Sequence, residues 1–526
     1  MTVDVGTGGG SIKSDIGDLD CGATCSAQVR EGTVITLTAT PASGSTFIGW
    51  RRDAATCGTE STCSLTVSGS PLRVGARFAQ HGTAAWVAQF GGPGSERDIR
   101  VTRGRDGTST AAFGYSDSIT FDGTTFPHVG DLDLGLVHLS AAGDTLWTRT
   151  IAGAGPHYPA GIAVTQTGDV VLFGAYGSMT DFGGPGPLPF PAGDTKDFFV
   201  AKFAGTTGAL LWQKAIHADD NDDPGVGDVT LDEAGDVYIA GAFNTSIDFG
   251  DGSIASTTPG DNEVFLAKLD GTDGAVVWLK RLGGPGSAIY AEDVVAARGD
   301  VLHVVGNFGA SCNIGGSAMV PVGGRDGFIG TFSSVTGQYL RQRQLGGTGD
   351  DTVTAVAVDI NGLTYLAMSS EAVAGGVSFA GQSLSGAGTG GETVVGALDS
   401  LNMVRWAQRF GGSGSDVPTR LATLADGSVA LLGSFTSPTI AFGDTVLTNS
   451  GSMNTFLARL SPGTGATTWA AAIRSNLAET ADSLAATGNS LTVGGGFSTQ
   501  VNVLGAPLVG VGRSDAFAAD VPLPPP

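Results

Sequence analysis

From residue 84 onward, short apolar runs alternate with glycine-rich turns. In one stretch, residues 228–232 alternate between polar and apolar side chains, and two further apolar runs follow at 237–243 and 264–269. Alternation with period two, bounded by Gly, Pro, Asn or Asp, is typical of β-strands. No stretch of useful length repeats with the helical period. The pattern predicts an all-β protein.

The same order of glycine-rich turns and apolar runs recurs about every 63 residues. Each copy has a Gly-rich turn, three runs and a tryptophan-bearing fourth run. The tryptophans are Trp86, Trp147, Trp212, Trp278, Trp406 and Trp469. The gap between 278 and 406 spans two periods, and Leu340 fills the missing position. A fixed period of this length indicates a repeat architecture.

Seven such copies of four short strands predict a seven-bladed β-propeller over residues 84–521. Ring closure buries the faces of each sheet and removes terminal blades that would need caps. An open solenoid is the rival architecture. The sequence also predicts how the ring closes. The strand at residues 84–90 has no partner strand before it, and the strand at residues 515–521 has none after it. We expect these segments to pair, and residues 522–526 to form a Pro-rich tail that marks a linker.

Residues 1–79 do not match the repeat and form a separate β-rich region. Residues 33–40 read as a strand, residues 72–78 as a closing strand, and Trp50 as a core anchor. Its four cysteines are Cys21, Cys25, Cys57 and Cys63. Their spacing favours two local disulfides, 21–25 and 57–63, and an all-cysteine zinc site is the alternative. Cys312, the fifth cysteine, is expected to be an inert buried thiol.

Two family resemblances follow from these motifs. The order CGATC, EGTVITLTATPASGSTFIGW and a second cysteine pair resembles the divergent InlB B-repeat domain of bacterial surface proteins. This resemblance implies a small β-grasp-like module that spaces or presents other domains. The repeat, with DxxGxVYxxGxF and DxFLAKLD, resembles the bacterial SBBP β-propeller repeat. That resemblance implies an exported or cell-surface protein and fixes no activity.

A third resemblance concerns the tryptophans. DGTDGAVVW, ending at Trp278, and TGALLW, ending at Trp212, are similar to the tryptophan-docking motif of quinoprotein (PQQ) dehydrogenases. The resemblance implies a structural, blade-docking role for the six tryptophans. The adjacent-cysteine disulfide of many such enzymes is absent, so a quinoprotein-like oxidoreductase is a remote alternative.

The net charge of the chain limits which partners it can bind, and its cysteines indicate the compartment in which it works. The chain has 50 acidic and 27 basic residues, a formal net charge of −23. Nucleic acid is therefore not expected as a partner, because its binding depends on Lys and Arg at phosphates. No run is long enough for membrane insertion. Disulfides imply an oxidising compartment. We therefore expect an extracellular or cell-surface protein whose signal peptide, absent from this chain, has been removed.

Candidate chemistry is sparse. Asp219, Asp220, Asp222 and Asp223 concentrate hard oxygen ligands in one loop, as Ca²⁺ requires, although a solvated acidic loop is the simpler interpretation. Polar residues recur just before each third strand, and we expect turn or inter-blade hydrogen bonds from them. They are Asp197, Glu263, Asp326, Glu392, Asn454 and Asp515. Tyr115, His157, Tyr176 and Tyr290 are dispersed candidates for catalysis.

No catalytic residue and no cofactor are predicted, with Ca²⁺ as the one alternative. The pattern of fixed strands and variable loops favours a non-enzymatic extracellular or cell-surface scaffold that binds a protein or a glycan. A propeller enzyme acting on extracellular polysaccharide, as a lyase or hydrolase, is the alternative. It would need titratable groups that converge in one pocket.

Overall fold

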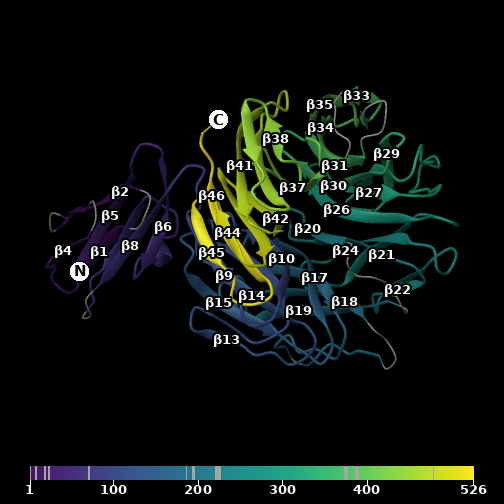
Figure 1. Ribbon diagram of the computed structural model, residues 1–526. Helices are drawn as coiled ribbons and strands as arrows, with labels where there is room; N and C mark the ends of the chain where they lie inside the picture. Colours follow the sequence, from purple (N-terminus) through teal and green to yellow (C-terminus); the bar gives the residue numbers. More distant parts are fainter. Residues whose placement is uncertain are drawn as a thin grey trace.

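The computed structural model describes residues 2–5, 9–16, 19–21, 24–68, 72–184, 186–191, 196–218, 227–371, 377–384, 390–477 and 479–525. A small N-terminal module stands beside a larger ring of sheets (Figure 1). Almost all regular structure is β, and the exception among the described residues is a single 3-10 turn, η1 (Ala55–Cys57). Among these residues no helix is long and apolar enough to cross a membrane. The all-β prediction is confirmed.

The N-terminal module consists of two four-stranded sheets. The first is ordered β4 (Thr24–Ser26), β1 (Thr2–Val5), β8 (Arg73–Gln80), β6 (Ser45–Arg52), and the second β3 (Asp20–Cys21), β2 (Gly10–Ser14), β5 (Val34–Pro41), β7 (Thr62–Thr66). Alternate residues of β5 are buried, as a sheet with one solvated face requires. Ile12, Leu37, Trp50 and Phe78 share one core with residues from both sheets. The β-grasp likeness implied for this module stays a prediction.

Disulfides join Cys21 to Cys25 and Cys57 to Cys63, with Cα–Cα distances of 5.7 and 5.5 Å. This is the connectivity that the spacing favoured, and it leaves no thiolates for a zinc site. The first bond links β3 to β4 and therefore ties the two sheets together. The second ties η1 to β7. A module with a small core gains stability from such constraints on its unfolded chain.

Antiparallel sheets with four core strands each make up the ring, and two of these sheets carry two further strands. Each is ordered from the centre outward. In chain order they are β10 (Glu96–Arg103), β11 (Ser109–Tyr115), β14 (Asp133–Leu139), β15 (Thr145–Ile151); β16 (His157–Val164), β17 (Val170–Tyr176), β18 (Asp197–Phe203), β19 (Leu210–Ala218); β20 (Gly227–Leu231), β21 (Val237–Phe243), β24 (Glu263–Leu269), β25 (Val276–Leu282); β26 (Ile289–Ala297), β27 (Val301–Phe308), β28 (Asp326–Ser333), β29 (Tyr339–Leu345); β30 (Asp351–Val358), β31 (Thr364–Glu371), β34 (Gly391–Leu398), β35 (Val404–Phe410); β36 (Asp416–Thr423), β37 (Val429–Phe435), β40 (Asn454–Leu460), β41 (Thr467–Ser475); and β42 (Glu479–Thr487), β43 (Ser490–Phe497), β46 (Asp515–Pro522), β9 (Trp86–Phe90).

Short two-stranded hairpins lie in the connections between the strands of the ring sheets. They are β12 (Ile119–Phe121) with β13 (Thr124–Phe126), β22 (Ser246–Asp248) with β23 (Ser253–Ala255), β32 (Val377–Phe379) with β33 (Gln382–Leu384), β38 (Thr439–Phe442) with β39 (Thr445–Thr448), and β44 (Gln500–Val503) with β45 (Ala506–Val509). The hairpins β22–β23 and β44–β45 pair with β19 and β41 and extend those sheets. They cover part of two outer edges that would otherwise be exposed.

The innermost strands contact one another in sequence, from β10 through β16, β20, β26, β30, β36 and β42 back to β10. The sheets are therefore arranged as in a β-propeller. The seventh sheet draws strands from both ends of the ring region, since β46 pairs antiparallel with β9 in a register that places Ala516 opposite Phe90 and Asp520 opposite Trp86. In Figure 1 the yellow C-terminal strands lie next to the blue start of the ring.

The tryptophans lie between sheets. Each indole packs against a glycine of the neighbouring turn that has positive φ, where a Cβ would lie within about 3 Å of the ring. The pairs are Trp86 with Gly143, Trp147 with Gly208, Trp212 with Gly274, Trp278 with Gly337, Trp406 with Gly465, and Trp469 with Gly82. Five of the six indole N–H groups also donate to a backbone carbonyl of the neighbouring sheet. We call the boundary between two neighbouring sheets a seam. Glycine is needed at these positions for its left-handed backbone and for its missing side chain.

One seam departs from this pattern and corrects the sequence interpretation. Trp212 and Trp278 stand opposite Lys202 and Lys268. In the sheet without a tryptophan, the equivalent residue opposite Thr331 is Arg341, and Leu340 is half exposed. The facing residue is Asn402, which has a φ of 59° in place of a glycine. Leu340 therefore does not occupy the tryptophan position, and the replacement of Trp by Arg accompanies the replacement of Gly by Asn.

The start of the expected tail belongs to the ring. Pro522 ends β46, Leu523 is buried in a ring core, and Arg459 donates to the carbonyl of Pro524. Gly82 N–H donates to the carbonyl of Pro522, so the two chain ends together form the turn on which Trp469 packs. Residues 522–524 therefore belong to the ring and not to a separate tail.

Candidate functional site: the central channel

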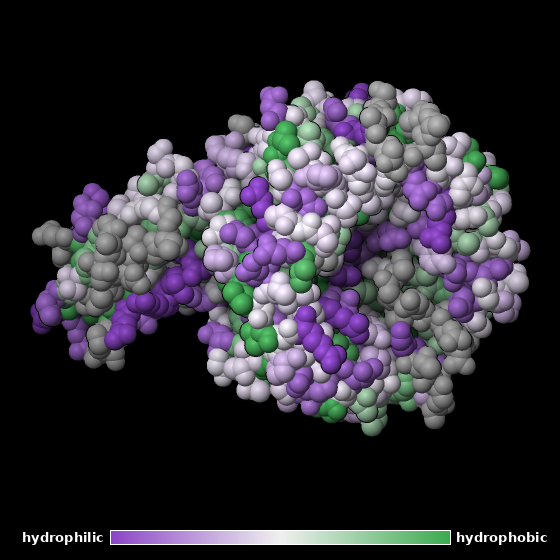
Figure 2. Space-filling view, in the orientation of Figure 1, coloured by the Kyte–Doolittle hydropathy of each residue, from purple (hydrophilic) through white to green (hydrophobic). Residues whose placement is uncertain are grey.

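The inner strands enclose a cavity of about 380 Å³ at the centre of the ring. Its walls come from β10, β16, β20, β26, β30, β36 and β42, and most of the lining is Val, Ala, Leu and Thr. In the space-filling view the ring is hollowed near its middle, with hydrophilic residues around the hollow (Figure 2). A concave site with a few polar groups among apolar walls is the usual form of a ligand pocket.

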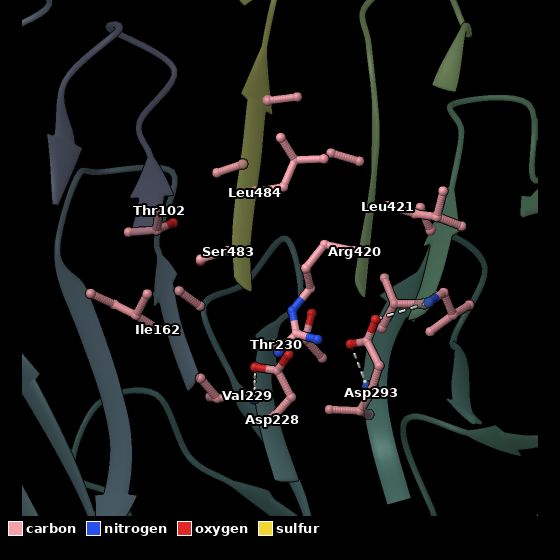
Figure 3. Close-up of a pocket in the computed structure, with 18 of the residues that line it drawn as sticks. Thr102, Ile162, Asp228, Val229, Thr230, Asp293, Arg420, Leu421, Ser483 and Leu484 are labelled. Carbon is pink, nitrogen blue, oxygen red and sulfur yellow. Dashed lines mark hydrogen bonds between the residues drawn. The ribbon is translucent and has the colours of Figure 1, made fainter. Parts of the chain in front are cut away.

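Four charged side chains line this cavity, namely Arg100 on β10, Asp228 on β20, Asp293 on β26 and Arg420 on β36. Arg420 extends toward the two aspartates in the close-up view (Figure 3). In three of the strands the pairing register shifts just before the charged residue, between 97 and 100, 291 and 293, and 418 and 420. A β-bulge re-aims the next side chain, which places a charge on the channel wall within an otherwise apolar strand.

The carboxylates are held by backbone N–H groups. Asp293 Oδ1 accepts from Val294 at 2.7 Å, and its Oδ2 accepts from Val356 on the next inner strand at 2.9 Å. Asp228 Oδ1 accepts from Val229 at 2.7 Å. Ser483 makes the equivalent bond across another seam, because its hydroxyl accepts from Val101 N–H at 2.8 Å. The bonds of Asp293 to Val356 and of Ser483 to Val101 join adjacent inner strands, and the other two fix the carboxylates on their own strands.

The guanidinium groups are only partly satisfied. Arg100 donates from Nε to the carbonyl of Ala160 at 2.6 Å and from Nη1 to that of Ile99 at 3.1 Å. Arg420 donates from Nη1 to the carbonyl of Thr419 at 2.9 Å. In the described part of the chain, no ion pair within 4.0 Å joins either arginine to Asp228 or Asp293. The remaining guanidinium N–H groups can therefore serve a polar ligand in the cavity.

Burial governs the protonation of the cluster. Burial and the neighbouring charge of Asp228 together raise the pKa of Asp293 to about 8, although Arg420 opposes the shift. Burial also raises the pKa of Asp228, against the pull of Arg420 and Arg100. For Arg100, burial and the nearby Arg420 lower the pKa. Near neutral pH the two carboxyls share at least one proton, so the cluster offers O–H donors as well as acceptors.

A further acid stands beside the cluster. Glu292 is the residue inserted at the bulge of β26, and burial raises its pKa while Arg420 and Arg325 oppose the shift. Asn307 Nδ2 donates to Glu292 Oε1 at 3.1 Å, and Asn307 Oδ1 is buried with no partner among the described residues. Glu292 therefore lies next to the cluster in the chain but does not line the cavity.

The residues singled out from the sequence lie elsewhere. Asp219, Asp220, Asp222 and Asp223 fall outside the described residues, so the structure does not address the Ca²⁺ hypothesis. Tyr115, Tyr176 and His157 are buried, and their partners are the carbonyls of Pro127 and Pro189 and the hydroxyl of Thr180. Neither they nor Tyr290, whose hydroxyl accepts from Asn262, line the channel cavity. Burial raises the pKa of Cys312 to about 12, as an inert thiol requires.

The polar residues at the start of the third strands bind backbone N–H groups in most cases. Asp326 accepts from the N–H of Val322, Asp515 from that of Val511 and Asn454 from that of Ser450. Other members are Asp197, which accepts from Ala218 N–H, Glu263, which accepts from Thr257, and Glu392, which pairs with Arg409. These contacts have the turn-binding character expected from the sequence, and none of these residues lines the channel.

The sequence contained a signal for the channel that its interpretation missed. Asp293 and Arg420 interrupt the apolar side of the first run in their repeat, where they alternate with Val295 and Ala422. Asp228 and Arg100 alternate regularly with apolar neighbours and carry no such signal. A charge on the apolar side of a predicted strand has to be paired, hydrated or bound to a ligand. Comparing the first runs of all repeats position by position would have pointed to Asp293 and Arg420, but not to Arg100 and Asp228.

Comparisons with known proteins identify a family likeness for the N-terminal module but say less about the ring. Residues 2–82 match the family model for the divergent InlB B-repeat domain, so the N-terminal module is InlB B-repeat-like. A 128-residue segment, 23% of the chain, is 39% identical to the regulatory protein FlaEY of Caulobacter vibrioides. That match spans only 12% of the length of FlaEY.

The solved structures that match this chain do so at low sequence identity and low TM-score. BamB from Moraxella catarrhalis is 12% identical with a TM-score of 0.34, over 81% of this chain and 98% of that one. The Dos1 propeller is 11% identical with a TM-score of 0.37, over 82% and 95%. The quinohemoprotein alcohol dehydrogenase of Comamonas testosteroni is 12% identical with a TM-score of 0.33, over 83% and 77%.

Proposed function

We propose that this protein is a non-enzymatic scaffold, secreted or at the cell surface, whose ring binds a polar group of a glycan or a protein in its central channel. The observation that carries the proposal is the convergence of Arg100, Asp228, Asp293 and Arg420 on one cavity without direct ion pairs between the arginines and the aspartates. Carboxyl and guanidinium groups together provide the paired donors and acceptors that recognise sugar hydroxyls or a peptide's polar side chain.

The finer features of the fold belong to the same proposal. The ring is a seven-bladed propeller of SBBP-type repeats, and the N-terminal module, with its two disulfides, is a β-grasp-like spacer of an exported protein. The InlB B-repeat match and the disulfides support an oxidising, extracellular location. Averaged electron-microscopy projections along the ring axis should contain seven sectors, and six or eight would contradict this part of the proposal.

The binding test uses the full chain on a glycan and peptide array, followed by calorimetry on each hit. Arg420→Gln and Asp293→Asn should weaken binding at least tenfold, because each removes a hydrogen-bonding partner of the ligand from a buried site. Arg405→Gln is the matched control, since Arg405 is an exposed arginine on the outer strand β35. If hits bind both channel variants as tightly as the control, the channel is not the site.

An enzyme acting on extracellular polysaccharide is the second candidate, and a specific observation favours it. Asp293 has a pKa raised by burial and by the neighbouring Asp228, as a general acid in a polysaccharide-cleaving site requires. Incubation with bound polysaccharides should then release new reducing ends or unsaturated products. Asp293→Asn should abolish the release while leaving binding measurable. If bound polysaccharide stays intact after prolonged incubation, the enzyme candidate is wrong and the binding proposal is kept.

A further inference from the structure

A second cavity lies at the seam between the N-terminal module and the ring. It has a volume of about 230 Å³ and is lined from the module by residues of β6 and by Thr59, and from the ring by turn residues that include Arg105, Asn489 and Ser490. Its charged lining residues are Arg103 and Arg105, and no acid lines it. A cavity with two cations and no carboxylate is unexpected in a chain of net charge −23.

The seam is well defined by contacts on one side of the cavity. Ile48 and Ala79 of the module share an apolar cluster with Trp86 of the ring. Arg51 donates from Nε to both oxygens of Asp144, at 2.9 and 3.1 Å. These contacts hold the two parts in a fixed relation, so the cavity walls are preformed.

Positive charge at the seam exceeds what its aspartates neutralise. Arg103 is nine-tenths buried and pairs with the buried Asp520 through Nη1, but its Nε has no partner among the described residues. Arg105 is exposed at the turn after β10 and has no ion pair in this part of the chain. Arg77 on β8 approaches the same region, where burial and the charge of Arg51 lower its pKa to about 10. Arginines that cannot be satisfied by nearby carboxylates favour an added anion.

We propose that this cavity, bounded by Arg103, Arg105 and the hydroxyl and amide groups of Thr59, Asn489 and Ser490, is a binding site for a small oxyanion such as a carboxylate, sulfate or phosphate group. Guanidinium N–H groups match the planar or tetrahedral oxygens of such groups. The neighbouring hydroxyls and the Asn489 amide supply further hydrogen bonds. The site is distinct from the central channel and does not depend on the function proposed for it. An oxyanion here would also join the module to the ring.

The test is direct observation with a heavy oxyanion. Crystals of the full chain soaked in selenate should give an anomalous peak in this cavity, within hydrogen-bond distance of Arg103 or Arg105. In solution, titration with inorganic sulfate, phosphate or acetate should shift the Arg Nε–H signals saturably, and the relative affinities identify the preferred oxyanion.

Variants separate a built site from general salt effects. Arg105→Gln should weaken the titrated oxyanion at least fivefold, because Arg105 is exposed and its replacement does not disturb the core. Arg298→Gln, an exposed arginine on the ring that pairs with Glu233, is the control and should leave the affinity unchanged. No selenate peak in the cavity, or equal affinity in the two variants, would overturn the proposal.

Discussion

The module and the ring stabilise β-sheets in different ways. The module closes one core between two sheets and adds two disulfides. The ring has no disulfide among its described residues and relies on indoles that pack on positive-φ glycines, together with the pairing of β9 with β46. A small domain buries too little surface to be stable without covalent constraints, whereas a closed ring gives every sheet two neighbours. The predictions below test that contrast.

Loss of one docking indole should have the largest effect. Trp147 is buried against Gly208 and its Nε1 donates to the carbonyl of Gly205. Trp147→Ala should therefore lower the free energy of unfolding by about 3–5 kcal/mol. Urea unfolding followed by circular dichroism measures the change. Leu146→Ala, at the exposed neighbouring position, is the control and should cost less than about 0.5 kcal/mol. Equal effects at the two positions would argue against docking as the source of ring stability.

Removal of a disulfide should act on the module alone. Cys57→Ala with Cys63→Ala opens a loop of sequence separation 6 and should cost about 2 kcal/mol in the module. Hydrogen exchange read by mass spectrometry should then accelerate in peptides from β5 and β7. Peptides from β21, in the ring, should exchange as before. Faster exchange throughout the ring would show that the two parts unfold as one unit.

The channel carboxyls should make the ring less stable as pH rises. Asp293 has a folded-state pKa of about 8, and that of Asp228 is also raised, so the folded protein holds protons that the unfolded chain releases near pH 4. The melting temperature should fall between about pH 4 and pH 8, and Asp293→Asn should flatten that slope.

Asp117→Asn removes an exposed carboxylate and serves as the comparison for this pH effect. It should change the slope much less than Asp293→Asn does, because Asp117 contributes only the smallest of the effects that raise the pKa of Glu96. Because burial raises the pKa of Glu96, to about 7, and that of Asp520, to about 6, a residual slope of the same sign should persist in Asp293→Asn. A steeper slope in Asp293→Asn than in the parent would contradict the direction of the shift.

Substitutions at the seam without a tryptophan should have the smallest effect on stability. Arg341→Trp alone should destabilise the ring, because Asn402 carries a Cβ where the other seams have a glycine. Adding Asn402→Gly should recover the loss, with a coupling energy of about 1 kcal/mol in a double-mutant cycle. Strictly additive effects would show that the Trp–Gly pairing is not a unit.

Much of the fold followed from local pattern. Strand runs such as 237–243 lie where the alternation and glycine punctuation put them, and the cysteine spacing favoured the disulfides found. The repeat position near residue 340 was misassigned, because both Leu340 and Arg341 fit an edge strand and only the pairing with Thr331 distinguishes them. The channel residues were missed, because a charge within one short run gives no information about what faces it.

The sequence by itself determined the strands, the repeat period and the cysteine pairs, because these depend on contacts between residues near one another in the chain. Tertiary structure alone decided that Arg100, Asp228, Asp293 and Arg420 face one cavity, and that Gly82 and Pro522 together complete the last docking turn. These groups are far apart in sequence, and bulges at the inner strands and closure of the ring set their positions.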